Sequence, residues 1–140
     1  MNILIVKLSS LGDVLHNLPV LWDLRAQYPQ AQIDWVVEEA YVELLQPLKT
    51  TPEFRGIDRI IPLAFRRWKK NLKRGEFIRS IQEFMAFKQD LQSTTYDLII
   101  DTQGLIKSAL VTYWANPQKK ASILGLANQT EFSGYEPWAR

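Results

Sequence analysis

The chain has 140 residues, no cysteine and a formal net charge of +2 at pH 7. Its length fits one domain with a sizeable core, and the lack of cysteine excludes disulfides, thiol nucleophiles and thiolate metal sites. No stretch approaches the ~18–20 apolar residues of a membrane span, and the N-terminus lacks the basic segment and long apolar run of a signal peptide. With 46% hydrophobic and 23% charged residues, a soluble, cytoplasmic globular protein is expected.

The charge is distributed unevenly along the chain. Residues 66–79 carry a net charge of +6, so the remainder carries −4. This asymmetry predicts an anionic partner at one place on the surface. Nucleic acid is not expected, because the total charge is small and the basic run is a single short segment.

Apolar runs rich in β-branched residues alternate with helical patterns. Strands are predicted at 3–6, 33–37, 59–62, 98–101 and 122–124, and helices at 12–27, 40–45, 77–92 and 105–115. This alternation predicts an α/β fold, a Rossmann-like doubly wound parallel sheet with strand order 3-2-1-4-5 in chain numbering.

Three local features of these elements are also predicted. Pro19 is expected to bend the first helix. A basic loop is expected between the strand at 59–62 and the helix at 77–92. That helix is expected to have an apolar face, formed by Phe77, Ile81, Phe84, Met85 and Leu91.

The first strand runs directly into a turn of small and polar residues. The turn contains one glycine, one cation, two hydroxyls and one carboxylate, namely Lys7, Ser9, Ser10, Gly12 and Asp13. A strand, turn and helix in this order form a ligand crevice at the carboxyl end of the strand, where helix N–H groups favour anions.

Asp13 is the candidate general base, which would take a proton from a hydroxyl. Lys7 and the helix dipole should both stabilise its ionised form. The alternative is a carboxylate that only stabilises the helix start. The other candidate bases near the crevice are His16, Glu38, Glu39 and Asp101, and a metal site is not expected, because His16 is the single histidine of the sequence.

Two further segments follow strands at the same edge. Asp101 to Gly104 end the fourth strand, and Gln103 and Lys107 are expected to reach the crevice, unless Asp101 caps the helix and Lys107 is solvated. The run Arg66-Arg67-Trp68-Lys69-Lys70 follows the third strand, and its arginines suit phosphate or carboxylate groups. The alternative for this run is a solvated basic face.

Four separated motifs carry a resemblance that spans nearly the whole chain. They lie at 5–19 (IVKLSSLGDVLHNLP), 34–39 (DWVVEE), 66–68 (RRW) and 101–108 (DTQGLIKS). Together they resemble the bacterial ADP-heptose:lipopolysaccharide heptosyltransferases, glycosyltransferase family 9, and in particular their heptosyltransferase I branch. The resemblance implies a GT-B fold of two Rossmann-like halves, with the Kdo-lipid A acceptor on the N-terminal half and the nucleotide sugar on the C-terminal half.

The resemblance also implies roles for individual residues. Asp13 matches the family's proposed base, and the acceptor-contacting basic segment maps onto Arg66, Arg67, Lys69 and Lys70. Lys7, Ser9, Ser10, Gly12, Gln103 and Lys107 are the remaining predicted acceptor-binding residues. The donor would be ADP-heptose, and transfer would invert the anomeric carbon without a metal or cofactor.

The chain is short for such an enzyme. Residues 1–140 are expected to form the acceptor-side domain, with the C-terminal nucleotide-sugar domain absent, either as a fragment or as a truncated gene product. Such a chain should not transfer heptose alone. It should contact the inner surface of the plasma membrane peripherally and self-associate through its exposed inter-domain face. The alternative function is a non-catalytic, Rossmann-like module that binds an anion or a nucleotide.

Overall fold

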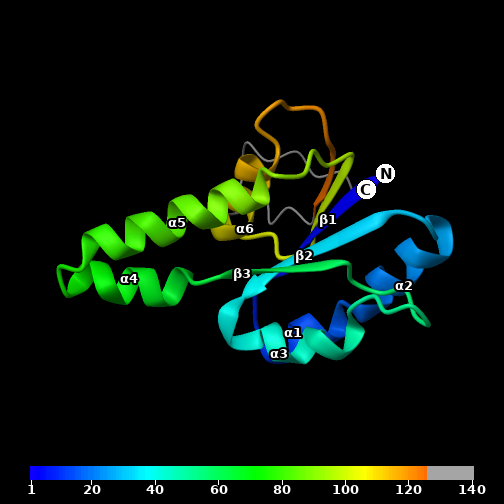
Figure 1. Ribbon diagram of the computed structural model, residues 1–140, viewed down its shortest axis with the longest axis horizontal. Coiled ribbons are helices and arrows are strands. Elements are labelled where there is room, and N and C mark those ends of the chain that lie inside the picture. Colours follow the sequence, from blue (N-terminus) through cyan, green and yellow to red (C-terminus); the bar gives the residue numbers. More distant parts are fainter. Residues whose placement is uncertain (126–140) are drawn as a thin grey trace.

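The computed structural model describes residues 1–125 and shows a five-stranded parallel sheet (Figure 1). The strands are β1 (Asn2–Val6), β2 (Gln32–Glu38), β3 (Arg59–Leu63), β4 (Leu98–Asp101) and β5 (Ser122–Gly125). They lie in the order β3-β2-β1-β4-β5, which confirms the predicted topology. The central strand β1 is flanked on both sides, and its last residue, Val6, lies beside Val36 and Asp101.

Helices cover both faces of the sheet (Figure 1). The α-helices are α1 (Leu11–His16), α2 (Leu18–Gln27), α3 (Val42–Leu45), α4 (Phe65–Lys73), α5 (Phe77–Leu91) and α6 (Ile106–Ala115), and the 3-10 turns are η1 (Glu39–Tyr41) and η2 (Gln46–Leu48). Alternate residues of β1 point into two apolar layers. Leu4 and Val6 pack with α5 and α6, whereas Ile3 and Ile5 pack with α1, α2 and α3.

The predicted helix at 12–27 is two helices that meet at Asn17. Pro19 lies in the first turn of α2, where a missing N–H costs little. A continuous helix would lose the hydrogen bond from residue 19 to Leu15 and would bring the proline ring against that carbonyl. The structure therefore shows a break where the sequence predicts a bend.

The predicted basic loop is the helix α4, so that prediction is wrong. Phe65, Trp68 and Leu72 recur at helical spacing, and α4 folds back on α5 as a hairpin that projects from the sheet (Figure 1). Gly75, with a φ of +77°, lies in the turn between the two helices. The indole N–H of Trp68 donates to Glu83 Oε2 at 2.7 Å, which ties α4 to α5.

The predicted apolar face of α5 is correct only in part. Leu91 is buried against the sheet, and Phe84 stacks edge-on against Trp68 with ring centroids 5.9 Å apart. Phe87, which is not among the predicted residues, is also buried, whereas Phe77 is exposed. Ile81 and Met85 lie along the projecting hairpin and are 56% and 55% exposed. The apolar face of α5 therefore extends beyond the core that it helps to close.

Arg25 joins α2 to the connection between β2 and β3. Its buried guanidinium donates to the Gly56 carbonyl at 2.7 Å and 3.0 Å and also to the carbonyl of Ala31. It forms an ion pair with Asp58 at 2.7 Å. Hydrogen bonds, including those from the Ile33 N–H and Arg25, outweigh the effect of burial and hold the pKa of Asp58 below its ordinary value.

Candidate functional site

The carboxyl ends of β1 and β4 bring two of the predicted segments together. Val6 and Asp101 are register partners, so the residues that follow them are neighbours in space. The Lys7 ammonium lies 3.5 Å from the Thr102 carbonyl, and the Ser9 N–H lies 3.5 Å from Gln103 Oε1. The β1–α1 and β4–α6 loops therefore meet at this edge of the sheet. Gln103 and Lys107, which are predicted from the sequence to reach the crevice of Asp13, line a separate hollow.

Asp13 lies in the first turn of α1 with its carboxylate at the surface. Its Oδ2 atom accepts hydrogen bonds from the N–H of Ser10 at 3.4 Å and from the Ser10 hydroxyl at 3.2 Å. These two contacts, followed by the charge of Lys7, hold the pKa of Asp13 below its ordinary value. The carboxylate is ionised at neutral pH, and Ser10 contributes more than Lys7 to the lowering of its pKa.

A hollow of about 530 Å³ opens beside Asp13. Lys7, His16, Asn17 and Thr102 are among the side chains that line it. Asn17 Nδ2 and Thr102 Oγ1 are buried and have no hydrogen-bond partner within the described part of the chain. Buried polar atoms of this kind usually have a partner. Val20, Ile100 and Leu124 also line the hollow, so an apolar wall faces the charged and polar groups of Lys7, Asp13 and His16.

A second hollow, of about 240 Å³, lies on the other side of the Ser9–Gln103 contact. Ser9, Gln103 and Lys107 line it together with Glu38 at the end of β2. From the sequence, Glu38 is only a substitute for Asp13 as the candidate base. The structure buries it, and its position at the carboxyl edge of the sheet is the signal that favours a role in the site.

The β4–α6 loop is organised by its own side chains. Asp101 Oδ1 accepts hydrogen bonds from the N–H groups of Gln103 at 3.0 Å and Gly104 at 3.1 Å. Gly104 has a φ of +68°, a conformation that favours glycine. Asp101 therefore shapes the loop rather than capping α6, and Lys107 lies over the Phe65 ring at 4.9 Å from its centroid rather than being simply solvated.

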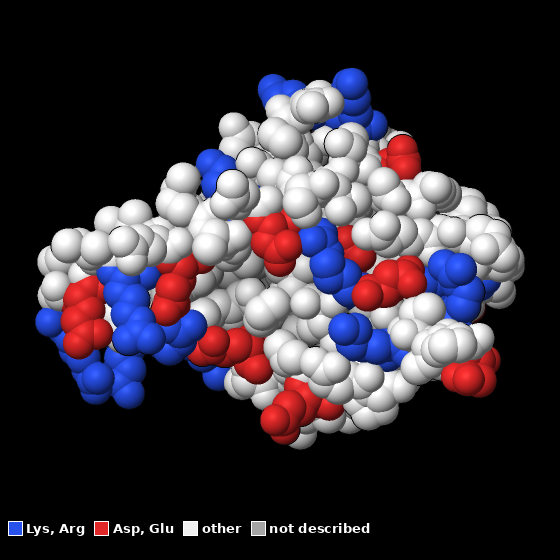
Figure 2. Space-filling model, viewed as in Figure 1, with Lys and Arg blue, Asp and Glu red and all other residues white. Residues whose placement is uncertain are grey.

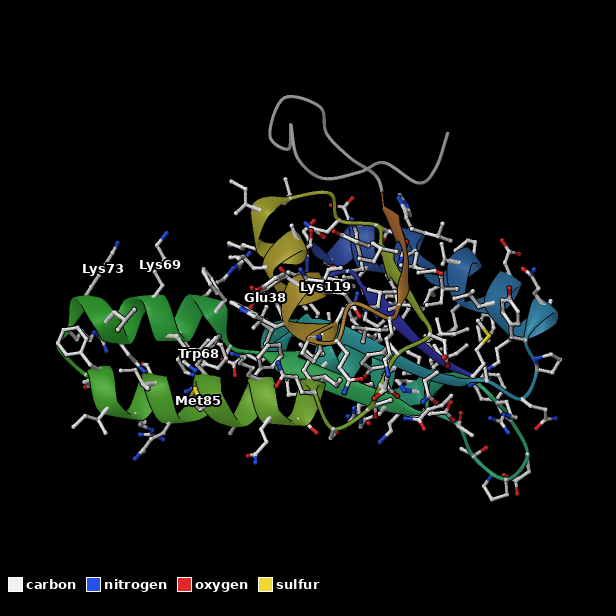
Figure 3. The ribbon with its side chains drawn as sticks, turned by 90° about the horizontal axis from the view of Figure 1, so that it is seen from above. Glu38, Trp68, Lys69, Lys73, Met85 and Lys119 are labelled. Carbon is white, nitrogen blue, oxygen red and sulfur yellow. The ribbon has the colours of Figure 1, made fainter. Side chains whose placement is uncertain are left out.

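The four basic residues predicted to bind acceptor do not form one cluster. Arg67 forms ion pairs with Glu39, at 3.1 Å, and with Glu83, so its charge is engaged within the fold. Burial raises the pKa of Glu38, and the charge of Arg66, after that of Lys107, offsets part of this rise. Lys69 projects from α4 on the side opposite α5 (Figure 3), and Lys70 is exposed. Acceptor binding by these residues stays a prediction.

The surface of the hairpin is strongly charged. Lys and Arg side chains gather over its free end, with acidic side chains among them (Figure 2). Across residues 1–125, no group of three His, Asp or Glu side chains is arranged to hold a metal ion. No helix in that range is both long enough and apolar enough to cross a membrane.

The fold and the site define a Rossmann-like domain of the kind found in glycosyltransferases. Residues 84–132 match the family model of glycosyltransferase family 9 (heptosyltransferase). The chain is 44% identical over 127 residues to lipopolysaccharide heptosyltransferase 1 of Pseudomonas aeruginosa, which covers 90% of this chain and 32% of that protein. It is also 44% identical to the protein of the same name from Escherichia coli K12 over 122 residues, 85% of this chain and 35% of that one.

Solved structures agree with these relatives. The E. coli heptosyltransferase WaaC with ADP superposes with a TM-score of 0.76 at 40% identity, over 94% of this chain and 38% of that one. A family 9 glycosyltransferase of Veillonella parvula shares the fold, with a TM-score of 0.67 at 18% identity, over 99% of this chain and 36% of that one. The chain belongs to the heptosyltransferases of glycosyltransferase family 9, and it spans about a third of the length of the relatives it matches.

Proposed function

We propose that this chain is the acceptor-binding part of a lipopolysaccharide heptosyltransferase that transfers heptose from ADP-heptose to the Kdo-lipid A inner core. The observation that carries the proposal is Asp13, an ionised carboxylate beside Lys7 that lines an open hollow at the carboxyl end of β1. The relatives named heptosyltransferase 1 supply the reaction class.

In the proposed reaction, an acceptor hydroxyl lies against Asp13. Its oxygen bonds to the anomeric carbon of the heptose while the bond from that carbon to the ADP oxygen breaks, and ADP leaves with the electron pair. The hydroxyl proton passes to Asp13, and the anomeric centre is inverted. Ser10 and Lys7 make Asp13 a weak base, which suits a proton that moves late in the reaction.

The acceptor is anionic, and the cations around the two hollows match it. Lys7 lines the hollow beside Asp13, and Lys107 lines the second. Ser9, Ser10, Gln103 and the open space beside Gly12 complete the proposed acceptor surface. These fixed cations supply the positive charge in the proposed mechanism, which uses no metal and no cofactor.

We assign residues 1–140 to the acceptor side, with nucleotide-sugar binding carried by a second domain. Group transfer depends on holding both reactants in line, and effective molarities for such positioning reach about 10⁵ M or more. The 140-residue chain alone should therefore bind acceptor without transferring heptose. It should also self-associate through the face that meets the second domain.

The hairpin of α4 and α5 is the proposed contact with the inner face of the plasma membrane, where a lipid-linked acceptor would lie. Ile78 is 75% exposed and Ile81 is 56% exposed on α5. Lys69 and Lys73 project from α4, while Trp68 lies between the two helices (Figure 3). An apolar surface flanked by ammonium groups suits the boundary between acyl chains and anionic headgroups.

A titration of the chain with deacylated Kdo-lipid A and with ADP tests the proposal. We expect saturable binding of the acceptor sugar and little binding of ADP. The alternative of a non-catalytic nucleotide module requires the reverse order of affinities. A chimera, in which this chain replaces the matching segment of the E. coli heptosyltransferase, then measures whether the chain supports transfer.

A further inference from the structure

Glu38 is a buried carboxylate whose burial the fold does not explain. It ends β2 and is 3% exposed. Its backbone N–H donates to the Leu8 carbonyl at 3.0 Å, but within residues 1–125 its side chain forms no hydrogen bond and no ion pair. Glu38 lines an open hollow, and a mostly buried carboxylate without a protein partner is a candidate for ligand binding.

The groups around Glu38 show what such a ligand would meet. Figure 3 places Glu38 between the base of the hairpin and α6. Ser9, Gln103 and Lys107 line the same hollow, and the charges of Lys107 and Arg66 act on the carboxylate. Lys107 and Glu38 form no direct ion pair. Two opposite charges therefore line one hollow of about 240 Å³ with space between them.

This arrangement selects among ligand classes. A carboxylate accepts hydrogen bonds from hydroxyl groups and repels other acids, whereas an ammonium attracts an acidic group. A simple anion would be attracted by Lys107 and repelled by Glu38. A ring that carries both hydroxyls and an acidic group would satisfy both side chains at once.

We propose that Glu38 is a specificity-determining residue that binds the hydroxyl groups of a sugar acid in this hollow, while Lys107 binds its acidic group. The inference rests on the proposed function, because the Kdo-lipid A acceptor contains such a sugar acid. It adds a binding role for a carboxylate apart from the base. Burial also raises the pKa of Glu38.

The test compares two small probes on the 140-residue chain, namely free Kdo, which is a hydroxylated sugar acid, and acetate, which has no hydroxyl group. Binding is followed by amide NMR shifts, with Glu38→Gln as the test variant. Glu43→Gln, at an exposed glutamate of α3, is the matched control. We expect Kdo to shift Leu8, Ser9 and Gln103 in the wild type. Loss of a hydrogen bond to a charged group should weaken Kdo binding about tenfold or more in Glu38→Gln.

Acetate separates recognition of hydroxyls from simple electrostatics. Acetate binding should be unchanged or stronger in Glu38→Gln, because a repulsive charge is removed. If Glu38→Gln strengthens both probes equally, or changes neither, the inference is wrong. If the variant does not fold, the wild-type Kdo footprint decides, and a footprint that omits the hollow overturns the inference.

Deacylated Kdo-lipid A distinguishes this inference from the proposed function. If that acceptor binds away from the hollow, the proposed function stands and the proposed role of Glu38 is wrong. Binding of free Kdo in the hollow, with no binding of deacylated Kdo-lipid A, preserves the role of Glu38 and removes the proposed acceptor.

Discussion

Gly12 offers a substitution that separates the site from the fold. An added Cβ at Gly12 would meet no atom within 4 Å, and the residue lies in the helix α1. Gly12→Ala should therefore stabilise the chain by about 0.4–1 kcal/mol, because alanine restricts the unfolded chain and favours helix. For a domain of this size the melting temperature should rise by roughly 1–4 °C. The same methyl group would fill open space beside Asp13, so acceptor binding should weaken.

Thermal unfolding by circular dichroism and titration with deacylated Kdo-lipid A measure the two effects separately. Gly75→Ala is the matched control, since Gly75 has a φ of +77° and no atom within 4 Å of an added Cβ. That variant should be destabilised by about 1 kcal/mol through backbone strain alone, with acceptor binding unchanged. A lower melting temperature for Gly12→Ala, or unchanged binding, would refute the reasoning that Gly12 is reserved for ligand.

Three further predictions concern charged side chains. Arg25→Met should lower the free energy of unfolding in urea by about 3–5 kcal/mol, because Asp58 and the Gly56 carbonyl lose their buried partner. A decrease of less than about 1 kcal/mol would contradict this prediction. Burial raises the pKa of Glu38 above its ordinary value of 4.5, so ionising this group costs stability in the folded state. As pH rises through the folded-state pKa, the free energy of unfolding of the wild type should therefore fall relative to that of Glu38→Gln. The same dependence of unfolding free energy on pH in both proteins would disprove this prediction. Arg66→Ala should weaken acceptor binding without changing the melting temperature, whereas Arg67→Ala should lower the melting temperature through loss of its ion pairs. A lower melting temperature for Arg66→Ala, with weaker acceptor binding only for Arg67→Ala, would contradict this assignment.

The sheet could be predicted from the sequence because its signals are local. Runs such as Ile3–Val6 and Leu98–Asp101 are short, apolar and followed by turns, and alternation with helices fixes a parallel topology. The helix α4 is harder to predict from the sequence, because its helical spacing depends on three apolar residues among many cations. Its burial depends on Trp68 packing against α5, a contact made across a turn and not visible in the segment alone.

In the candidate site, too, local features can be predicted from the sequence, whereas contacts between distant segments cannot. The proximity of Asp13 to Lys7 follows from their places in one short turn, and the strand order predicts that Gln103 lies near this turn, where it contacts Ser9. The burial of Glu38 does not follow from its own neighbours in sequence, since it depends on α6 and the base of α4 closing over the end of β2. The pairing of Arg67 with Glu39 and Glu83 is likewise a tertiary feature.

The most direct test of the account is heptosyl transfer by the chimera carrying Asp13→Asn. Asparagine keeps the size of Asp13 and can still accept from Ser10, but it cannot take a proton. We expect kcat to fall about 10²–10⁴-fold with acceptor KM nearly unchanged, while Asp23→Asn, at an exposed aspartate of α2, behaves as the parent chimera. An unchanged kcat, or a loss fully explained by unfolding of the chimera, would contradict the role of Asp13 as the base.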